Sequence, residues 1–253
     1  AGYRFTLAGV LTIVLGSILQ RKILLPKRSA IGKIGLLSLL QTVLQYLFFY
    51  IGLAHTTGVK ASIIEAVSTF VAILVAGYLF HQETVTSRKM LGCLIGFAGV
   101  VLVNVAGSGM DFHFSPAGDG CILLSTVAYA FSSVCMKRFS QKEDPVMLSG
   151  YQFILGGIVM IACGAAMGGH LKAFTASAAA LLIYMAMISA VAYSLWGMLL
   201  KYNPVSKVTV FGFMNPVIGV ILSALLLNET ESLGVSSVLA LGLVCVGIYI
   251  VNA

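Results

Sequence analysis

The chain has 253 residues, of which 59% are hydrophobic and only 9% are charged, with a mean hydropathy of +1.03. Soluble domains carry about 25% charged residues. The 15 basic and 8 acidic side chains cannot cover a 26.7 kDa globule, which excludes a water-soluble protein. The net charge of +7 does not indicate nucleic acid, because the cations form short clusters between apolar runs. We therefore expect an all-α, polytopic membrane protein whose partner is the lipid bilayer.

Apolar runs long enough to cross a bilayer follow one another along the chain. A hydrocarbon core of ~30 Å needs about 20 such residues per helix, and charges, prolines and Gly/Ser clusters separate the runs. We predict nine spans, covering residues 2–20, 34–53, 60–80, 89–105, 117–137, 146–167, 178–200, 205–227 and 233–252. Pro116, Pro145 and Pro204 stand where helices should begin, whereas Pro216 alone falls inside a span.

Lysine and arginine segregate strongly when the nine spans alternate in direction. Only Arg4, Lys60 and Lys172 fall on one side of the membrane. The other side holds Arg21, Lys22, Lys27, Arg28, Lys33, Arg88, Lys89, Lys137, Arg138, Lys142, Lys201 and Lys207. The positive-inside rule makes that side cytoplasmic, so we expect a cytoplasmic carboxyl terminus.

The two halves of the sequence resemble each other at an offset of 148 residues. The first half contains Gly2, Tyr3, Phe5, Leu7, Gly9, Gly99, Val103 and Asn104, which recur as Gly150, Tyr151, Phe153, Leu155, Gly157, Gly247, Val251 and Asn252. After small gaps, Lys60 matches Lys207 and Glu83-Thr84 matches Glu229-Thr230. We predict a first repeat over 1–105 and a second over 106–253.

The span at 117–137 has no counterpart in the first repeat. We therefore expect four helices in the first repeat and five in the second, with a tenth helix preceding Ala1 in the natural protein. An odd number of spans per complete repeat inserts the two repeats in opposite directions, as in many secondary transporters. Such a protein has two similar halves around one central cavity.

With these features the sequence resembles the EamA-type ten-helix drug/metabolite transporters over essentially its whole length. The resemblance rests on the repeat and on four stretches: Gly52 to Glu65, Phe80 to Glu83, Gly92 to Asn104, and Asn215-Pro216. It implies a multi-pass carrier of the bacterial inner membrane that moves small polar or amphipathic metabolites, commonly outward, without ATP. The chain departs from the family in the missing first helix.

Glu65 is the clearest functional candidate, because an ionisable residue at membrane depth is costly. It lies five residues beyond Lys60, or roughly 7 Å at 1.5 Å per residue. Low dielectric favours the neutral form of a carboxyl, so Glu65 could bind and release a proton and couple proton entry to transport. Alternatively it pairs with Lys60 or reaches the interface. The matching residue of the second repeat is Gly212, so only the first repeat has a carboxylate at this position.

Other polar side chains occupy similar depths and are candidates for substrate binding. Ser68 and Thr69 continue the Glu65 face of their helix. Gln41 and Gln45 lie one turn apart and match Ser189 and Tyr193, while Phe48 matches Trp196. These groups offer hydrogen bonds and flat apolar surface to a substrate. The alternative, hydrogen bonding between helices at about 0.6 kcal/mol each, stays open for every one of them.

Two further features belong to the same candidate set. Asn215-Pro216 lies near the midpoint of its predicted span, where proline frees a backbone carbonyl and bends the helix. Pro216 is thus a candidate hinge and Asn215 a substrate contact, with a permanent structural bend as the alternative. Tyr129 joins Ser125 and Ser132 or Ser133 in a hydroxyl face, for which simple packing is the alternative.

We expect an exporter of small metabolites such as amino acids or drug-like compounds, working by alternating access. A membrane-embedded enzyme is the alternative, but the sequence has no HExxH, no GxSxG and no second acid near Glu65. A receptor would ordinarily carry a soluble domain. No cofactor, metal or catalytic residue is predicted: five scattered cysteines form no CxxC pair, and no GxxxxGK[ST] loop is present. A monomer is the simplest assembly.

Overall fold

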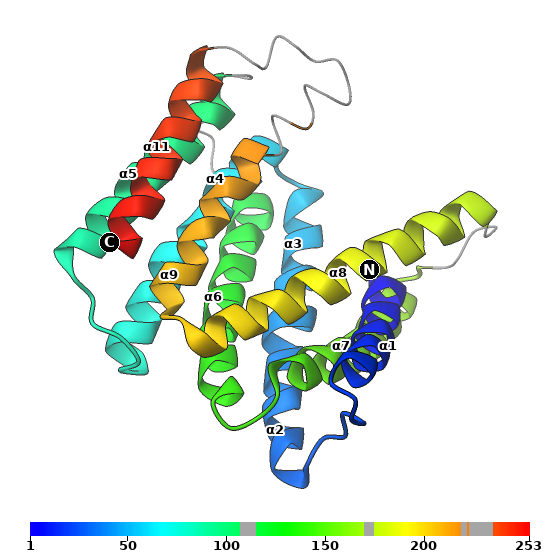
Figure 1. Cartoon of the computed structure of the whole chain (residues 1–253). Coiled ribbons are helices and arrows are strands. Elements are labelled where there is room, and N and C mark those ends of the chain that lie inside the picture. Colours follow the sequence, from blue (N-terminus) through cyan, green and yellow to red (C-terminus); the bar gives the residue numbers. More distant parts are fainter. Residues whose placement is uncertain (107–114, 170–174, 219–221, 223–234) are drawn as a thin grey trace. The chain divides into compact units, whose positions relative to one another are not determined.

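The computed structural model describes residues 1–106, 115–169, 175–218, 222 and 235–253. Throughout this part of the chain the regular structure is helical, without a strand, which confirms the predicted all-α class (Figure 1). The chain forms two compact units. Unit 1 comprises Ala1–Leu47 and Cys135–Tyr202, and unit 2 comprises Phe48–Val134 and Asn203–Ala253. The units thus combine segments of both predicted repeats, and the division at residue 105 stays a prediction.

Unit 1 combines helices from two separate segments of the chain. It contains α1 (Gly2–Leu19), α2 (Arg28–Leu37), the π-helix η1 (Ser38–Leu44), the start of α3 (Gln45–Leu53), α7 (Pro145–Ala166) and α8 (Ala176–Tyr202). Asp144 caps α7, because its Oδ1 accepts hydrogen bonds from the backbone N–H groups of Val146 (2.9 Å) and Met147 (3.1 Å). With Pro145 in the first turn, this cap explains why the helix begins where the sequence predicts.

Glycines bring α1 and α7 into close contact inside unit 1. A β-carbon at Gly9 would lie 2.6 Å from the carbonyl oxygen of Gly150, and one at Gly157 would lie 2.9 Å from that of Gly2. Gly2 matches Gly150 in the repeat, and Gly9 matches Gly157. The contact is therefore reciprocal, as expected for two elements related by a twofold axis.

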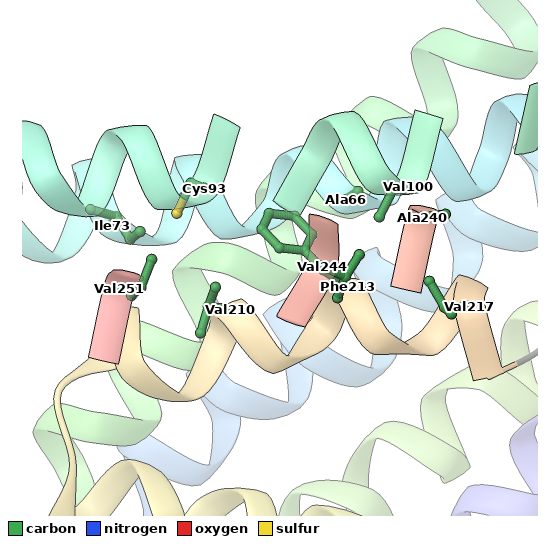
Figure 2. Close-up of a cluster of buried hydrophobic side chains, with 10 residues drawn as sticks. All are labelled: Ala66, Ile73, Cys93, Val100, Val210, Phe213, Val217, Ala240, Val244 and Val251. Carbon is green, nitrogen blue, oxygen red and sulfur yellow. The ribbon is translucent and has the colours of Figure 1, made fainter. Parts of the chain in front are cut away.

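Unit 2 contains most of the remaining helices. They are α4 (Gly58–Leu74) with the π-helix η2 (Val75–Leu79), α5 (Ser87–Ala106), the π-helix η3 (Pro116–Gly120), most of α6 (Cys121–Ser140), α9 (Val205–Thr209), the 3-10 helix η4 (Val210–Phe213) and α11 (Val235–Asn252). Figure 2 shows the apolar core of this unit, where Phe213 lies among side chains of α4, α5 and α11. Because Ile73, Cys93 and Val100 are fully buried here, α4 and α5 are fixed against the same core.

The packing of α5 against α11 repeats the reciprocal pattern of unit 1. A β-carbon at Gly92 would lie 2.8 Å from the carbonyl oxygen of Gly247, and one at Gly99 would lie 2.8 Å from that of Ala240. Gly92 matches Ala240, and Gly99 matches Gly247, at the same 148-residue offset. Each unit therefore has one close helix pair whose members are repeat mates.

Among the described residues, six helices are long and apolar enough to cross a membrane. They cover Gly2–Leu19, Arg28–Leu53, Lys60–Leu79, Pro116–Ser140, Pro145–Ala166 and Ala176–Tyr202. The predicted spans 89–105 and 233–252 correspond to α5 and α11, while the span 205–227 is described only at 205–218 and 222. Lys33 lies within a helix instead of a loop, because the second span starts at Arg28. Lys172, Glu229 and Thr230, which the predicted topology and repeat include, lie outside the described residues.

Candidate functional site

A layer of buried polar side chains joins η1 to α7 in unit 1. The amide layer consists of Gln41, Thr42, Gln45 and Gln152, all at most 9% exposed. Gln152 Nε2 donates a hydrogen bond of 2.6 Å to Gln41 Oε1. Within the described structure, Gln41 Nε2, Thr42 Oγ1, Gln45 Oε1 and Gln152 Oε1 are buried without a partner. The layer therefore retains donors and acceptors that water or a ligand could satisfy.

The amide layer modifies the predicted roles of Gln41 and Gln45. Gln41 is paired with another helix, which agrees with the interhelical alternative, whereas Gln45 keeps a carbonyl oxygen without a partner in the described chain. The partner Gln152 was not predicted from the sequence. Its spacing from Ser149 and Gly156 on α7 was the available signal, since the three residues share one helix face.

An aromatic cluster lies next to this layer. The hydroxyl groups of Tyr46 and Tyr193 are 2.6 Å apart, and the Tyr193 ring meets Phe153 edge to face with centroids 4.8 Å apart. Trp196 lies one turn further along α8, half-buried. Ser189 is buried and donates to the carbonyl oxygen of Met185 on its own helix (2.9 Å). Tyr193 therefore joins the cluster, while the Ser189 hydroxyl is engaged within α8.

Arg4 also belongs to this part of unit 1. Its guanidinium carbon lies 4.5 Å from the ring centroid of Phe5 and 5.6 Å from that of Tyr46. The Arg4 Nε atom is buried without a hydrogen-bond partner in the described structure. The sequence suggested only a topological role for this arginine, because its neighbour Tyr46 on α3 is distant in the chain.

Glu65 lies on α4 in unit 2, with an exposed side chain. It does not pair with Lys60, whose Nζ lies 3.9 Å from Asp119 Oδ2. No hydrogen bond or ion pair involves Glu65 among the residues that the structure describes. Pairing with Lys60 is therefore not observed, and the carboxylate stays available to solvent or ligand.

The two hydroxyl residues beside Glu65 differ in their surroundings. Thr69 is buried and donates a hydrogen bond of 3.1 Å to the carbonyl oxygen of Thr209 on α9. Ser68 is half-buried on the same helix. The structure thus gives Thr69 a packing role between α4 and α9, and leaves Ser68 the more accessible of the two.

The Asn215-Pro216 step follows a change of helix type. Residues Val210–Phe213 form the 3-10 helix η4, and Asn215 is exposed while Pro216 is half-buried. Proline cannot donate a hydrogen bond to a preceding carbonyl, and a tighter 3-10 turn accommodates that loss. Tyr129 is half-buried on α6, where its carbonyl oxygen accepts a hydrogen bond of 2.7 Å from Ser132 Oγ.

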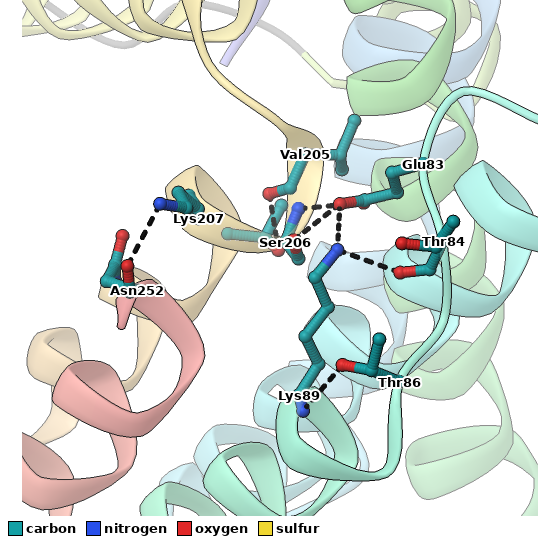
Figure 3. A network of polar contacts seen from close by, with 9 residues as sticks. Glu83, Thr84, Thr86, Lys89, Val205, Ser206, Lys207 and Asn252 are labelled. Carbon is teal, nitrogen blue, oxygen red and sulfur yellow. Dashed lines mark hydrogen bonds and ion pairs between the residues drawn. The ribbon is translucent and has the colours of Figure 1, made fainter.

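Two buried carboxylates of unit 2 were not selected from the sequence. Figure 3 shows the carboxylate network, in which Glu83 accepts hydrogen bonds from Ser206 N (2.9 Å), Ser206 Oγ (2.5 Å) and Lys89 Nζ (2.8 Å). Lys89 Nζ also donates to Thr84 O (2.9 Å). Asp119 accepts from Thr56 Oγ1 and from Ser115 N (2.9 Å), besides its pair with Lys60. Both carboxylates are satisfied and connect distant segments, which indicates structural roles.

Metal chemistry has no support in the described ranges, where no group of three His, Cys, Asp or Glu side chains could hold an ion. The predicted substrate-binding residues carry uncharged amide, hydroxyl and indole groups, which can form hydrogen bonds with a small molecule.

Comparison with known proteins identifies a family of transporters. Residues 1–105 and 116–253 match the model of the EamA-like transporter family. An uncharacterized transporter of Archaeoglobus fulgidus is 30% identical over 90% of this chain and 79% of its own length. The uncharacterized transporter YvbV of Bacillus subtilis is 26% identical over 100% and 81%. A crystal structure with 19% identity has the same fold, with a TM-score of 0.83 over 99% of this chain and 86% of that one. The chain therefore belongs to the EamA-like transporter family and is a multi-pass membrane transporter.

Proposed function

We propose that this transporter exports small metabolites, such as amino acids or drug-like compounds, across a bacterial inner membrane by alternating access. Its carboxyl terminus lies in the cytoplasm, and it works as a secondary carrier without ATP hydrolysis. Reciprocal packing of repeat mates in each unit supports two inverted repeats, the architecture that alternating access uses. The Escherichia coli relative YedA, 27% identical over 92% of this chain, is named an inner membrane transporter, which supports the location.

The single observation that carries proton coupling is the state of Glu65. Its side chain is exposed and has no ion-pair or hydrogen-bond partner in the described part of the chain. An ionised carboxylate is not stable against lipid hydrocarbon, so Glu65 either faces water or carries a proton. Both conditions suit a group that exchanges protons during a transport cycle.

Substrate contacts are proposed for the predicted polar set, each within its own unit. In unit 1 these are Gln41, Gln45, Ser189, Tyr193 and Trp196, and in unit 2 they are Ser68, Thr69, Tyr129 and Asn215. Gln45 and Tyr193 have the strongest support in unit 1, because one retains an unused acceptor and the other a hydroxyl beside an aromatic surface. Pro216 is proposed as the hinge of its helix.

Coupling is tested with the purified full-length protein in liposomes loaded with candidate amino acids. We expect efflux to accelerate when an inward proton gradient is imposed. Glu65→Gln should abolish that acceleration, and it should leave the efflux measured without a gradient unchanged. Glu143→Gln is the matched control, since it removes a carboxylate that pairs with Lys33 at 2.7 Å. Equal gradient dependence in wild type and Glu65→Gln would remove Glu65 from the mechanism.

A further inference from the structure

Arg4 differs from the paired lysines of the described structure. Lys22, Lys33, Lys60 and Lys89 each have a carboxylate oxygen within 4 Å, at 3.6, 2.7, 3.9 and 2.8 Å. Arg4 lies in α1, a helix apolar enough to span a membrane, and has neither a carboxylate nor a hydrogen-bond acceptor among the described residues. The contacts that the described residues make with its half-buried guanidinium are with aromatic rings.

Aromatic contact alone satisfies a guanidinium poorly. Cation–π attraction to Phe5 and Tyr46 is weak and supplies no hydrogen-bond acceptor, and Arg4 Nε is buried without one among the described residues. The two rings hold the guanidinium between α1 and α3 without supplying an acceptor. A planar guanidinium in this situation matches the two oxygens of a carboxylate.

The surroundings of Arg4 add groups that suit the rest of such a ligand. Tyr46, whose ring lies beneath the guanidinium, shares its hydroxyl with Tyr193 on α8 at 2.6 Å. Phe5 and Phe153 extend the apolar surface, with ring centroids 5.2 Å apart. One cation, two phenol hydroxyls and an aromatic wall thus come together from four helices of a single unit.

We propose that Arg4 binds the carboxylate of the transported molecule, with the Tyr46 and Tyr193 hydroxyl groups beside it, so that the preferred substrates are small organic acids and amino acids. This inference rests on the proposed transport function and names its substrate class. The same chemistry would recognise the phosphate of an anionic lipid headgroup, and the experiment separates the two sources.

Binding can be followed through the only tryptophan of the chain, Trp196, which lies on α8 one turn from Tyr193. The full-length protein in detergent is titrated with amino acids and aromatic carboxylates, each paired with its primary amide. We expect the acids to shift the Trp196 emission at concentrations at least tenfold lower than the amides. Arg4→Gln should remove that preference, because one lost charge-assisted hydrogen bond corresponds to about a tenfold or larger change.

Two controls make the result specific. Arg28→Gln removes an exposed arginine of the same unit and should keep the preference for acids. Arg4→Lys keeps the charge but loses the planar fork, so an intermediate preference is expected. Equal responses to acids and amides in the wild type, or no response to any acid, overturn the inference.

Lipid and transport measurements complete the test. Efflux of the acids that respond is measured from vesicles of phosphatidylcholine alone and from vesicles containing phosphatidylglycerol. A defect of Arg4→Gln in both vesicle types supports substrate recognition, whereas a defect only with phosphatidylglycerol assigns Arg4 to the lipid. If acids bind but no variant transports anything, the proposed function fails while the assignment of Arg4 stands.

Discussion

The amide layer of unit 1 and the carboxylate network of unit 2 are both buried and polar, yet they differ in how many of their polar atoms have hydrogen-bond partners. Glu83 in the network uses both carboxylate oxygens, and its partners belong to α5 and α9. The amide layer leaves four polar atoms without partners in the described structure. A satisfied buried network fixes a scaffold, whereas an incomplete one is a place where a ligand or water gains hydrogen bonds.

The largest expected effect tests the scaffold side of this comparison. Glu83→Ala should lower the free energy of unfolding by about 3–5 kcal/mol, because it leaves the Lys89 ammonium buried without its carboxylate. Thermal unfolding of the protein in detergent measures the change. Adding Lys89→Met should recover a large part of the loss, and no recovery would show that the pair is not coupled.

The second largest loss of stability is expected from replacing a glycine in one of the close helix pairs. Gly9→Leu is expected to destabilise unit 1 by about 3 kcal/mol, because its β-carbon would already overlap the Gly150 carbonyl at 2.6 Å. Gly164→Ala on α7 is the matched control, since its β-carbon meets nothing within 4 Å. Helix propensity predicts that this control gains stability, by up to about 1 kcal/mol. Comparable losses in both variants would contradict the packing described for α1 and α7.

The amide layer should tolerate paired replacement better than single replacement. Gln41→Leu leaves the Gln152 amide unsatisfied and should cost about 1–3 kcal/mol, while Gln41→Leu with Gln152→Leu should approach wild-type stability. The double variant should nevertheless bind substrates more weakly in the Trp196 titration. Unchanged binding would limit the layer to a structural role and weaken the contrast with the carboxylate network.

The smallest effect concerns the hydrogen bond between α4 and α9. Thr69→Val removes the donor to Thr209 O while conserving shape, and should cost about 0.6 kcal/mol, the average for such bonds in membranes. Ser68→Ala, on the more accessible neighbour, should leave stability unchanged and reduce transport. The reverse pattern would exchange the roles assigned to these two side chains.

Hydropathy alone was sufficient to predict the membrane fold, since a segment that crosses lipid must be a long apolar helix and the positions of proline and lysine mark its ends. The helix of the second span begins at Arg28, six residues before the predicted start of the span at 34, because Arg28 and Lys33 look like loop residues. In the structure Lys33 is half-buried within the helix and pairs with Glu143. A single sequence does not show such a partner 110 residues away.

The candidate site was less predictable for the same reason. Glu65 stands out because a carboxylate is rare in an apolar run, but Arg4, Asp119 and Gln152 acquire their significance from neighbours on other helices. Internal similarity was a long-range signal in the sequence, and several glycines that repeat at the 148-residue offset make the reciprocal contacts seen in the structure. Which polar residues pair with each other depends on helix rotation, and hydropathy does not encode rotation.

The most direct test of the account is flux through the full-length protein in sealed liposomes without any nucleotide. The account predicts saturable efflux of a small metabolite, above the rate of protein-free liposomes and accelerated from the opposite side by the same metabolite. Flux indistinguishable from that of empty liposomes, across a panel of amino acids and organic acids, would contradict the proposed secondary transport.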